Sequence, residues 1–85
     1  MSVCVFVADI PEFASVVAAA RTLENARLHA PRKGYWCIES DRQLQFERKP
    51  MKLGPALWYS MLSGGFRGRI VEFGRDRLII GTEGA

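Results

Sequence analysis

The residues that most often do chemistry are scarce in this sequence. It has one histidine, His29, and two cysteines, Cys4 and Cys37, at no spacing that a zinc site uses. A nucleophilic serine or thiol needs a base and an orienting acid beside it, and no segment of the sequence carries such a set. We therefore predict no metal, no cofactor and no catalytic residues, and we favour a non-catalytic protein over an enzyme.

Long apolar runs are absent as well. No stretch approaches the roughly 18 apolar residues that a membrane span requires, and residues 2–8 are too short, and lack the basic flank, for a secretory signal. Cys4 and Cys37 each lie inside an apolar, strand-like run. We predict no membrane association, a cytoplasmic location and two reduced, buried thiols, with a disulfide between neighbouring strands as the alternative.

What the chain has in excess is apolar side chains. Of its 85 residues, 48% are hydrophobic, and these include two tryptophans and five phenylalanines. A domain of this size buries only about 60% of the surface that its unfolded chain exposes. Surplus apolar side chains are therefore expected to be covered by another chain. The composition predicts one small domain over residues 1–85 that forms a homodimer or docks on a protein partner.

Positive charge is unevenly distributed along the chain, whose formal net charge is +3. Residues 1–25 carry one base and three acids, a net charge of −2, whereas residues 26–85 carry eleven bases and six acids, a net charge of +5. This bias favours an anionic partner for the C-terminal part. Arginines interleaved with acids are also typical of an ordinary solvated surface, so the charge alone selects no partner.

The first 25 residues predict a strand followed by a helix. Val3–Ala8 alternates β-branched residues with others, which is typical of a central strand. Residues 9–12 read Asp-Ile-Pro-Glu and predict a helix start with Asp9 as its cap. Apolar positions at helical spacing then continue to Leu23, so one face of the helix is expected to pack on a sheet.

The middle of the chain is harder to assign from its sequence. Residues 26–30 fit either a short strand or an irregular connection, and residues 31–34 predict a turn. Residues 35–39 and 44–47 flank a polar segment, which predicts a hairpin. Residues 48–52 are basic and predict a linker.

The last third of the chain predicts a second helix and a second hairpin. In the segment 53–65, Gly54 and the following proline mark a helix start, an apolar stripe follows, and a glycine pair marks the stop. Residues 69–73 and 77–80 flank a Gly-Arg-Asp turn. Residues 82–85 are expected to be frayed.

The expected element order is strand, helix, hairpin, helix, hairpin. Because both helices have a single apolar face, the expected fold is α+β, a mainly antiparallel sheet with two helices packed on one face. The other face of the sheet would be left for water, a ligand or a second chain. Its expected binding residues are Phe6, Tyr35, Trp36, Arg67 and Arg69.

Two segments carry a pattern of aromatic and basic residues that is found in a known family. Val5–Ile10 reads Val-Phe-Val-Ala-Asp-Ile, and Lys33–Ile38 reads Lys-Gly-Tyr-Trp-Cys-Ile. These resemble the two short signatures of RNA-recognition-motif domains, with Phe6 and Tyr35 at aromatic positions. Trp36 departs from the pattern, which has a small residue there. The resemblance implies that the two aromatic rings stack on nucleic-acid bases.

Three functional hypotheses follow from the sequence. The leading one is a non-catalytic interaction domain that dimerises or docks through an aromatic sheet face. The first alternative is single-stranded nucleic-acid binding on the same face. The second alternative is a small-ligand-binding protein or an enzyme whose site is shared across a dimer, built from His29, Glu39, Ser63 and Arg69 of two chains.

Overall fold

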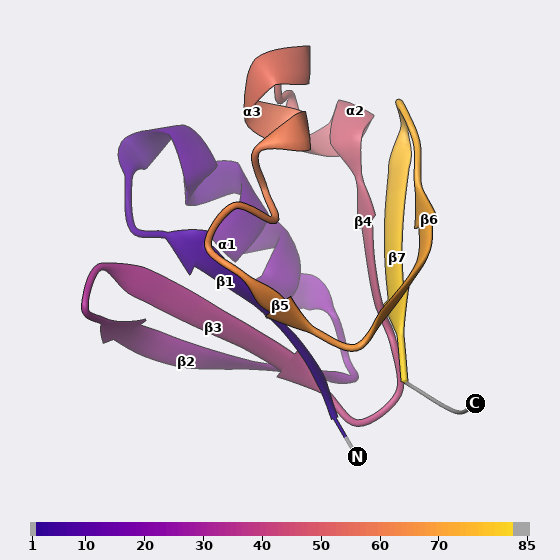
Figure 1. Cartoon of the computed structure of the whole chain (residues 1–85). Helices are drawn as coiled ribbons and strands as arrows, with labels where there is room; N and C mark the ends of the chain where they lie inside the picture. The colour runs from indigo at the N-terminus through magenta and orange to yellow at the C-terminus, as the bar shows by residue number, and fades with distance from the viewer. Residues whose placement is uncertain (1, 83–85) are drawn as a thin grey trace.

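The computed structural model of the protein, drawn in Figure 1, describes residues 2–82, so the segment predicted to be frayed lies outside it apart from Thr82. In chain order the elements are β1 (Val3–Ala8), the 3-10 helix η1 (Pro11–Phe13), α1 (Ala14–Thr22), β2 (Ala26–Arg32), β3 (Tyr35–Ser40), β4 (Leu44–Glu47), α2 (Arg48–Met51), α3 (Pro55–Tyr59), β5 (Phe66–Arg67), β6 (Arg69–Phe73) and β7 (Arg77–Gly81).

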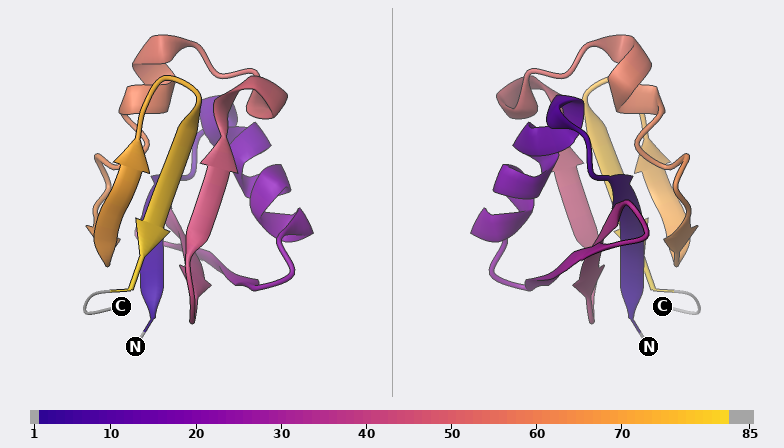
Figure 2. Two further views of the ribbon diagram at one scale, coloured as in Figure 1. Left: turned by 90° about the vertical axis from the view of Figure 1, so that its right-hand side faces the viewer. Right: turned by 90° about the vertical axis from the view of Figure 1, so that its left-hand side faces the viewer.

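The strands form two antiparallel sheets. The first sheet has the order β2-β3-β1-β5, and the second has the order β4-β7-β6. An α+β domain built on antiparallel sheet is therefore confirmed, but the expectation of a single sheet with both helices on one face is not. Figures 1 and 2 show the two sheets standing at an angle to each other, with α1 against the first sheet.

The two sheets are joined where β5 continues into β6, with only Gly68 between them. Gly68 has a φ of +126°, a backbone conformation that side-chain-bearing residues rarely adopt. A Cβ atom at this position would also lie 2.8 Å from the carbonyl oxygen of Gly81 and 2.8 Å from Cγ1 of Val3. The strand path can therefore bend from one sheet into the other here because residue 68 has no side chain.

The hairpin predicted from residues 35–39 and 44–47 is wrong. β3 pairs with β2 on one side and β1 on the other, whereas β4 pairs with β7. The reason is burial: Leu44 and Phe46 of β4 lie opposite Ile80 and Leu78 of β7, and all four side chains are buried. The uncertain segment 26–30 belongs to strand β2, which forms the actual hairpin with β3.

The terminal hairpin is confirmed. β6 pairs with β7 in antiparallel register, with an irregularity between Ile70 and Glu72. The predicted turn lies between the two strands, and the amide of Gly74 donates a hydrogen bond to the carbonyl oxygen of Arg77 at 3.0 Å.

The predicted helix starts differ in detail from the observed ones. Asp9 does not cap the first helix; its Oδ1 accepts a hydrogen bond from the indole Nε1 of Trp36 at 3.0 Å. Ile10 takes the position before η1 and makes no side-chain capping bond. Gly54 does precede α3, as predicted, but regular helix ends at Tyr59 and turns continue beyond it.

The basic segment 48–52 is not a plain linker. It contains the short helix α2, whose Met51 is buried in the core. The Arg48 side chain donates to the carbonyl oxygens of Arg75 at 2.7 Å and Leu53 at 3.1 Å. One guanidinium therefore joins the β6–β7 turn to the segment before α3. This structural role of Arg48 could not be inferred from a sequence segment that is merely basic.

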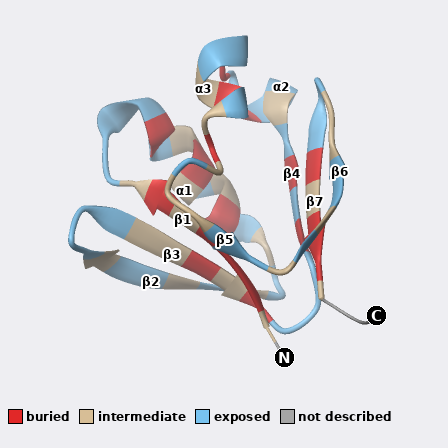
Figure 3. Ribbon diagram, in the orientation of Figure 1, coloured by how far each residue is buried: buried red, intermediate tan, exposed pale blue. Residues whose placement is uncertain are grey.

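The hydrophobic core lies between the inner faces of the two sheets and is closed by residues of α1 and α3. Figure 3 shows buried residues concentrated on β1, α1, β4 and β7, while β2 and β5 are mostly exposed. The buried hydrophobic residues are Val3, Val5, Val7, Phe13, Val16, Ala20, Ile38, Leu44, Phe46, Met51, Leu53, Trp58, Met61, Leu78 and Ile80.

Trp58 is the largest fully buried side chain. Its ring packs edge-on against Phe73 at a centroid distance of 5.7 Å, and its Nε1 donates to the carbonyl oxygen of Gly74 at 2.8 Å. This indole therefore packs α3 against β6 of the second sheet, whereas α1 lies against the first sheet.

Trp58→Ala is expected to lower the free energy of unfolding by about 3–5 kcal/mol, because it leaves a large cavity and an unpaired carbonyl. Urea denaturation followed by circular dichroism measures this. The control is Trp36→Ala, at the other tryptophan, which is only partly buried and is expected to cost far less. Equal costs for the two variants would contradict the assignment of Trp58 to the core.

Candidate functional site

The first sheet has one face turned toward the core and one turned away from it. Cys4 and Phe6 of β1 lie opposite Glu39 and Cys37 of β3, and residues directly opposite each other share a face. The alternate residues of β1, all valines, are buried in the core. We define the open face by the residues that register places on the other side: Cys4, Phe6, Ala8, Arg27, His29, Tyr35, Cys37, Glu39 and Arg67.

Three of the five predicted binding residues lie on the open face, and two do not. Phe6, Tyr35 and Arg67 share it. Trp36 lies opposite a core valine and so points to the side of α1, where its ring sits 5.7 Å from the Arg21 guanidinium carbon. Arg69 belongs to β6 in the second sheet. Arg69 was placed with the others because a single sheet was predicted. Trp36 cannot share a face with its neighbour Tyr35, because successive side chains of a strand point to opposite faces.

A groove runs across the open face beside the β2–β3 turn. It has a volume of ≈ 500 Å³. It is lined by Phe6, His29, Ala30, Pro31, Arg32, Tyr35 and Cys37. Tyr35 is 42% exposed, and Phe6 and Cys37 are half-buried. Aromatic walls with a basic rim suit a ligand or partner that presents planar or apolar groups together with negative charge.

Gly64 brings the two aromatic residues of the groove together. A Cβ atom at this position would lie 2.5 Å from the backbone oxygen of Phe6 and 2.8 Å from Cε1 of Tyr35. The tyrosine ring can therefore lie against the chain only where residue 64 has no side chain. The sequence predicts the glycine pair as a helix stop, and its contact with Tyr35 leaves no signal in the sequence.

An ionic network occupies the other end of the open face. The Glu39 carboxylate lies 2.9 Å from Nε2 of His29 and 3.5 Å from the Arg27 guanidinium. Arg27 also donates to both carboxylate oxygens of Asp41, at 3.0 and 3.1 Å. The hydrogen bond with His29, followed by those with Ser2 and the charge of Arg27, lowers the pKa of Glu39. The bond from Arg27 likewise lowers the pKa of Asp41.

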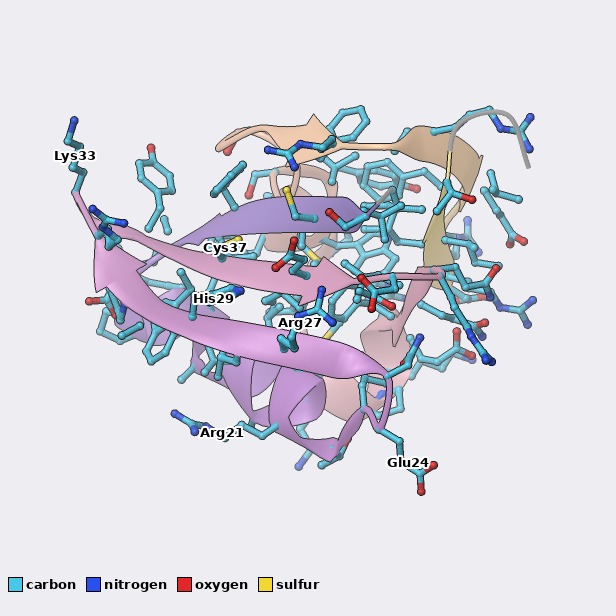
Figure 4. The ribbon with its side chains drawn as sticks, turned by 90° about the horizontal axis from the view of Figure 1, so that it is seen from below. Arg21, Glu24, Arg27, His29, Lys33 and Cys37 are labelled. Atoms are coloured by element: carbon cyan, nitrogen blue, oxygen red, sulfur yellow. The ribbon has the colours of Figure 1, made fainter. Side chains whose placement is uncertain are left out.

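Cys37, His29 and Glu39 together contain the residue types of a thiol nucleophile, a base and an orienting acid. Cys37 lies directly opposite His29 in the sheet, as Figure 4 shows. However, burial, followed by the neighbouring Cys4 and Glu39, raises the pKa of Cys37 to about 11. A thiol with such a pKa is protonated at neutral pH and is a poor nucleophile. The arrangement therefore favours binding over covalent catalysis.

The hypothesis of a site shared across a dimer drew on four polar residues. His29 and Glu39 contact each other within one chain. Ser63 lies in the turns that follow α3, and Arg69 lies on the second sheet. Within residues 2–82 the structure does not bring these two pairs together around one groove.

Three of the positively charged residues without an ion pair in the described chain lie on or beside the open face. Arg32, Lys33 and Arg67 make no ion pair within the described residues, whereas Arg27 and His29 are matched by Glu39. Lys33 and Gly34 have φ values of 54° and 86°, which is the left-handed geometry of a tight hairpin turn. Figure 4 shows Lys33 projecting from this turn.

The comparisons with known proteins add no family. No model of a known protein family matches the sequence, and no characterised protein matches it significantly. Within residues 2–82, no helix is long and apolar enough to cross a membrane. The candidate site is therefore argued from its geometry alone. Sequence reasoning missed Pro31 and Arg32 as groove residues, because it left the neighbouring residues of β2 unassigned.

Gly64→Ala is expected to lower the free energy of unfolding by about 1–3 kcal/mol, because its methyl group overlaps Phe6 and the Tyr35 ring. The matched control is Gly74→Ala, where a Cβ atom meets nothing within 4 Å. Urea denaturation of both variants, with tyrosine ring shifts read by NMR, measures the difference. A Gly64→Ala protein as stable as the control, with unmoved tyrosine signals, would refute this account of the groove.

Glu39→Gln is expected to destabilise the protein at neutral pH but not in acid. Because the contacts of Glu39 lower its pKa below the ordinary 4.5, its stabilisation is present above that value and is lost as pH falls through the folded-state pKa. Thermal melting at pH 7 and at about pH 2.5 measures this. Glu24→Gln, an exposed carboxylate with no ion pair in the described chain, is the control. An effect of Glu39→Gln that persists in acid would contradict the assignment.

Proposed function

We propose that the protein is a non-catalytic interaction domain that forms a homodimer through the open face of its first sheet. The observation that carries this proposal is the aromatic groove between Phe6 and Tyr35, on the sheet face that α1 does not cover. Burying such rings against a second chain removes apolar surface from water. Cys37 remains protonated, so the face supports docking better than chemistry.

The distribution of charge along the β2–β3 hairpin favours a second copy as the partner. Arg32 and Lys33 lie at the turn, and Glu39 and Asp41 lie toward the other end. A two-fold axis that reverses one copy relative to the other would bring Arg32 and Lys33 of each copy to the end of its partner's hairpin that carries Glu39 and Asp41. Arg27 balances part of the charge at that end. Asp41 is 74% exposed in its side chain, so it can accept bonds from a partner lysine as well as from Arg27.

The size of the molecule is compatible with such a dimer. A stable interface buries about 800 Å² on each partner, and the chain has an accessible surface of 5302 Å². The excess of hydrophobic residues in the composition supports the same proposal.

Single-stranded nucleic acid is the second candidate partner. The observation that favours it is that Phe6 and Tyr35 sit on neighbouring strands of one face, close to Arg32, Lys33 and Arg67. Aromatic rings can stack on bases while unpaired arginines and lysines meet phosphates. The affinity for nucleic acid would then fall steeply as salt is added. The affinity of a dimer held together by buried aromatic rings would not.

The cytoplasm is the compartment that we propose. The two cysteines are free thiols in the structure, and unpaired thiols are typical of reducing compartments.

Charge-reversal variants at the hairpin ends test the dimer. Lys33→Glu and Asp41→Lys are each expected to weaken dimerisation about tenfold or more, because they place like charges opposite each other, and the double variant is expected to restore it. The control is Lys52→Glu, at an exposed lysine outside the open face with a similar positive φ of 56°. Sedimentation equilibrium gives the dissociation constants.

Native mass spectrometry of the protein from its own source separates the two candidates. A dimer without added mass, together with the rescue by double reversal, supports self-association. A monomer at all accessible concentrations refutes it. A retained oligonucleotide, released by salt and lost in Phe6→Ala, would establish nucleic-acid binding instead.

A further inference from the structure

The two cysteines meet on the open face, although 33 positions separate them in sequence. Cys4 of β1 lies opposite Glu39, and Cys37 of β3 lies opposite Phe6, so the two thiols are diagonal neighbours on adjacent strands. Cys4 is buried, and Cys37 is partly exposed in the groove.

Diagonal placement makes a direct disulfide difficult. Diagonal neighbours in an antiparallel pair have Cα atoms about 7–8 Å apart, whereas a disulfide joins Cα atoms about 4.4–6.8 Å apart. Closing a sulfur–sulfur bond would therefore require the two central strands of the first sheet to shift. One atom bonded to both sulfurs, with two bonds of roughly 2.3 Å as zinc–sulfur bonds have, bridges a wider separation than the single bond of about 2.05 Å in a disulfide.

We propose that Cys4 and Cys37 form a binding site for a soft d¹⁰ cation that accepts two thiolate ligands, of which Cu(I) is the biological example. Soft sulfur ligands select this ion. Within residues 2–82 no group of three or more histidine, cysteine, aspartate or glutamate side chains is placed to hold a metal ion. The proposed ion differs from Zn²⁺ in needing only two ligands. The proposal concerns the monomer, because the proposed dimer would cover the groove that Cys37 lines.

Positively charged residues near Cys4 and Cys37 would stabilise the complex that copper binding produces. Two thiols bind one Cu⁺ and release two protons, which leaves a bis-thiolate complex with a net charge of −1. Arg67 lies directly opposite Cys4, and His29 lies directly opposite Cys37. A fixed cation beside the pair stabilises the anionic complex, and Arg67 makes no ion pair elsewhere in the described residues.

The groove gives the ion a route to the site. Cys37 lines the groove and is the sulfur that an incoming complex can reach first, while Cys4 lies beneath the surface. An incoming copper complex would first exchange one of its ligands for Cys37. The transfer would be complete when the buried thiol of Cys4 replaces the last ligand of that complex. Because each thiol gives up a proton when it binds the ion, apparent affinity should rise by about tenfold per pH unit for each proton displaced.

An anaerobic titration tests the site. Reduced protein competes with bicinchoninate, a chromophoric Cu(I) chelator, for Cu(I) supplied as its acetonitrile complex. We expect one copper per chain, loss of competition in both Cys4→Ser and Cys37→Ser, and retained binding in His29→Gln. Affinity should rise between pH 6 and pH 8 in the wild type.

Several outcomes would overturn the proposal. The first is that no copper passes from the chelator to the protein. The second is that native mass spectra show one copper held between two chains. The third is that copper binding survives in both cysteine variants. Circular dichroism establishes whether the serine variants are folded. If they are not, X-ray absorption on the copper-loaded wild type decides: two sulfur neighbours and no nitrogen support the site, and any other ligand set refutes it.

Discussion

Gly68 lies so close to Val3 of β1 and to Ile80 and Gly81 of β7 that a Cβ atom at residue 68 would have no room. Besides Gly81 and Val3, such an atom would lie 3.0 Å from Cγ2 of Ile80. This close approach lets one strand path pair with β1 through residues 66–67 and with β7 through residues 69–73. The angle between the sheets, and the core that fills it, depend on this contact (Figure 2). A side chain here would have to push the sheets apart.

Local structure was largely predictable from the sequence, and pairing between distant segments was not. Alternation in residues 3–8 and the turn before residue 77 depend on neighbours in sequence, so strand β1 and the last hairpin were found. The partner of β4 is set by buried contacts of Leu44 and Phe46 with β7, more than thirty residues away. No local pattern distinguishes that pairing from a hairpin with β3.

The candidate site was predictable to the extent that it depends on strand alternation. Phe6 and Tyr35 were found because each lies on a recognisable strand, and the register then brings them together. Trp36 was misplaced because the face of a residue on β3 is fixed by pairing with β1, and its indole is held by Asp9 on the opposite side. The contact of Gly64 with the tyrosine ring is tertiary and has no counterpart in the sequence.

The pairing of β1 with β5 also sets the order in which the chain can fold during synthesis. The hairpin of β2 and β3, with α1, can assemble on β1 once residue 40 has emerged from the ribosome. Until residues 66–67 follow, one edge of β1 has unpaired backbone groups, and until residues 77–81 follow, its valines lack the complete second sheet. Open edges of this kind pair readily with other chains. The nascent chain is therefore most exposed to aggregation, and most in need of a chaperone, from the emergence of residue 40 until β7 has followed.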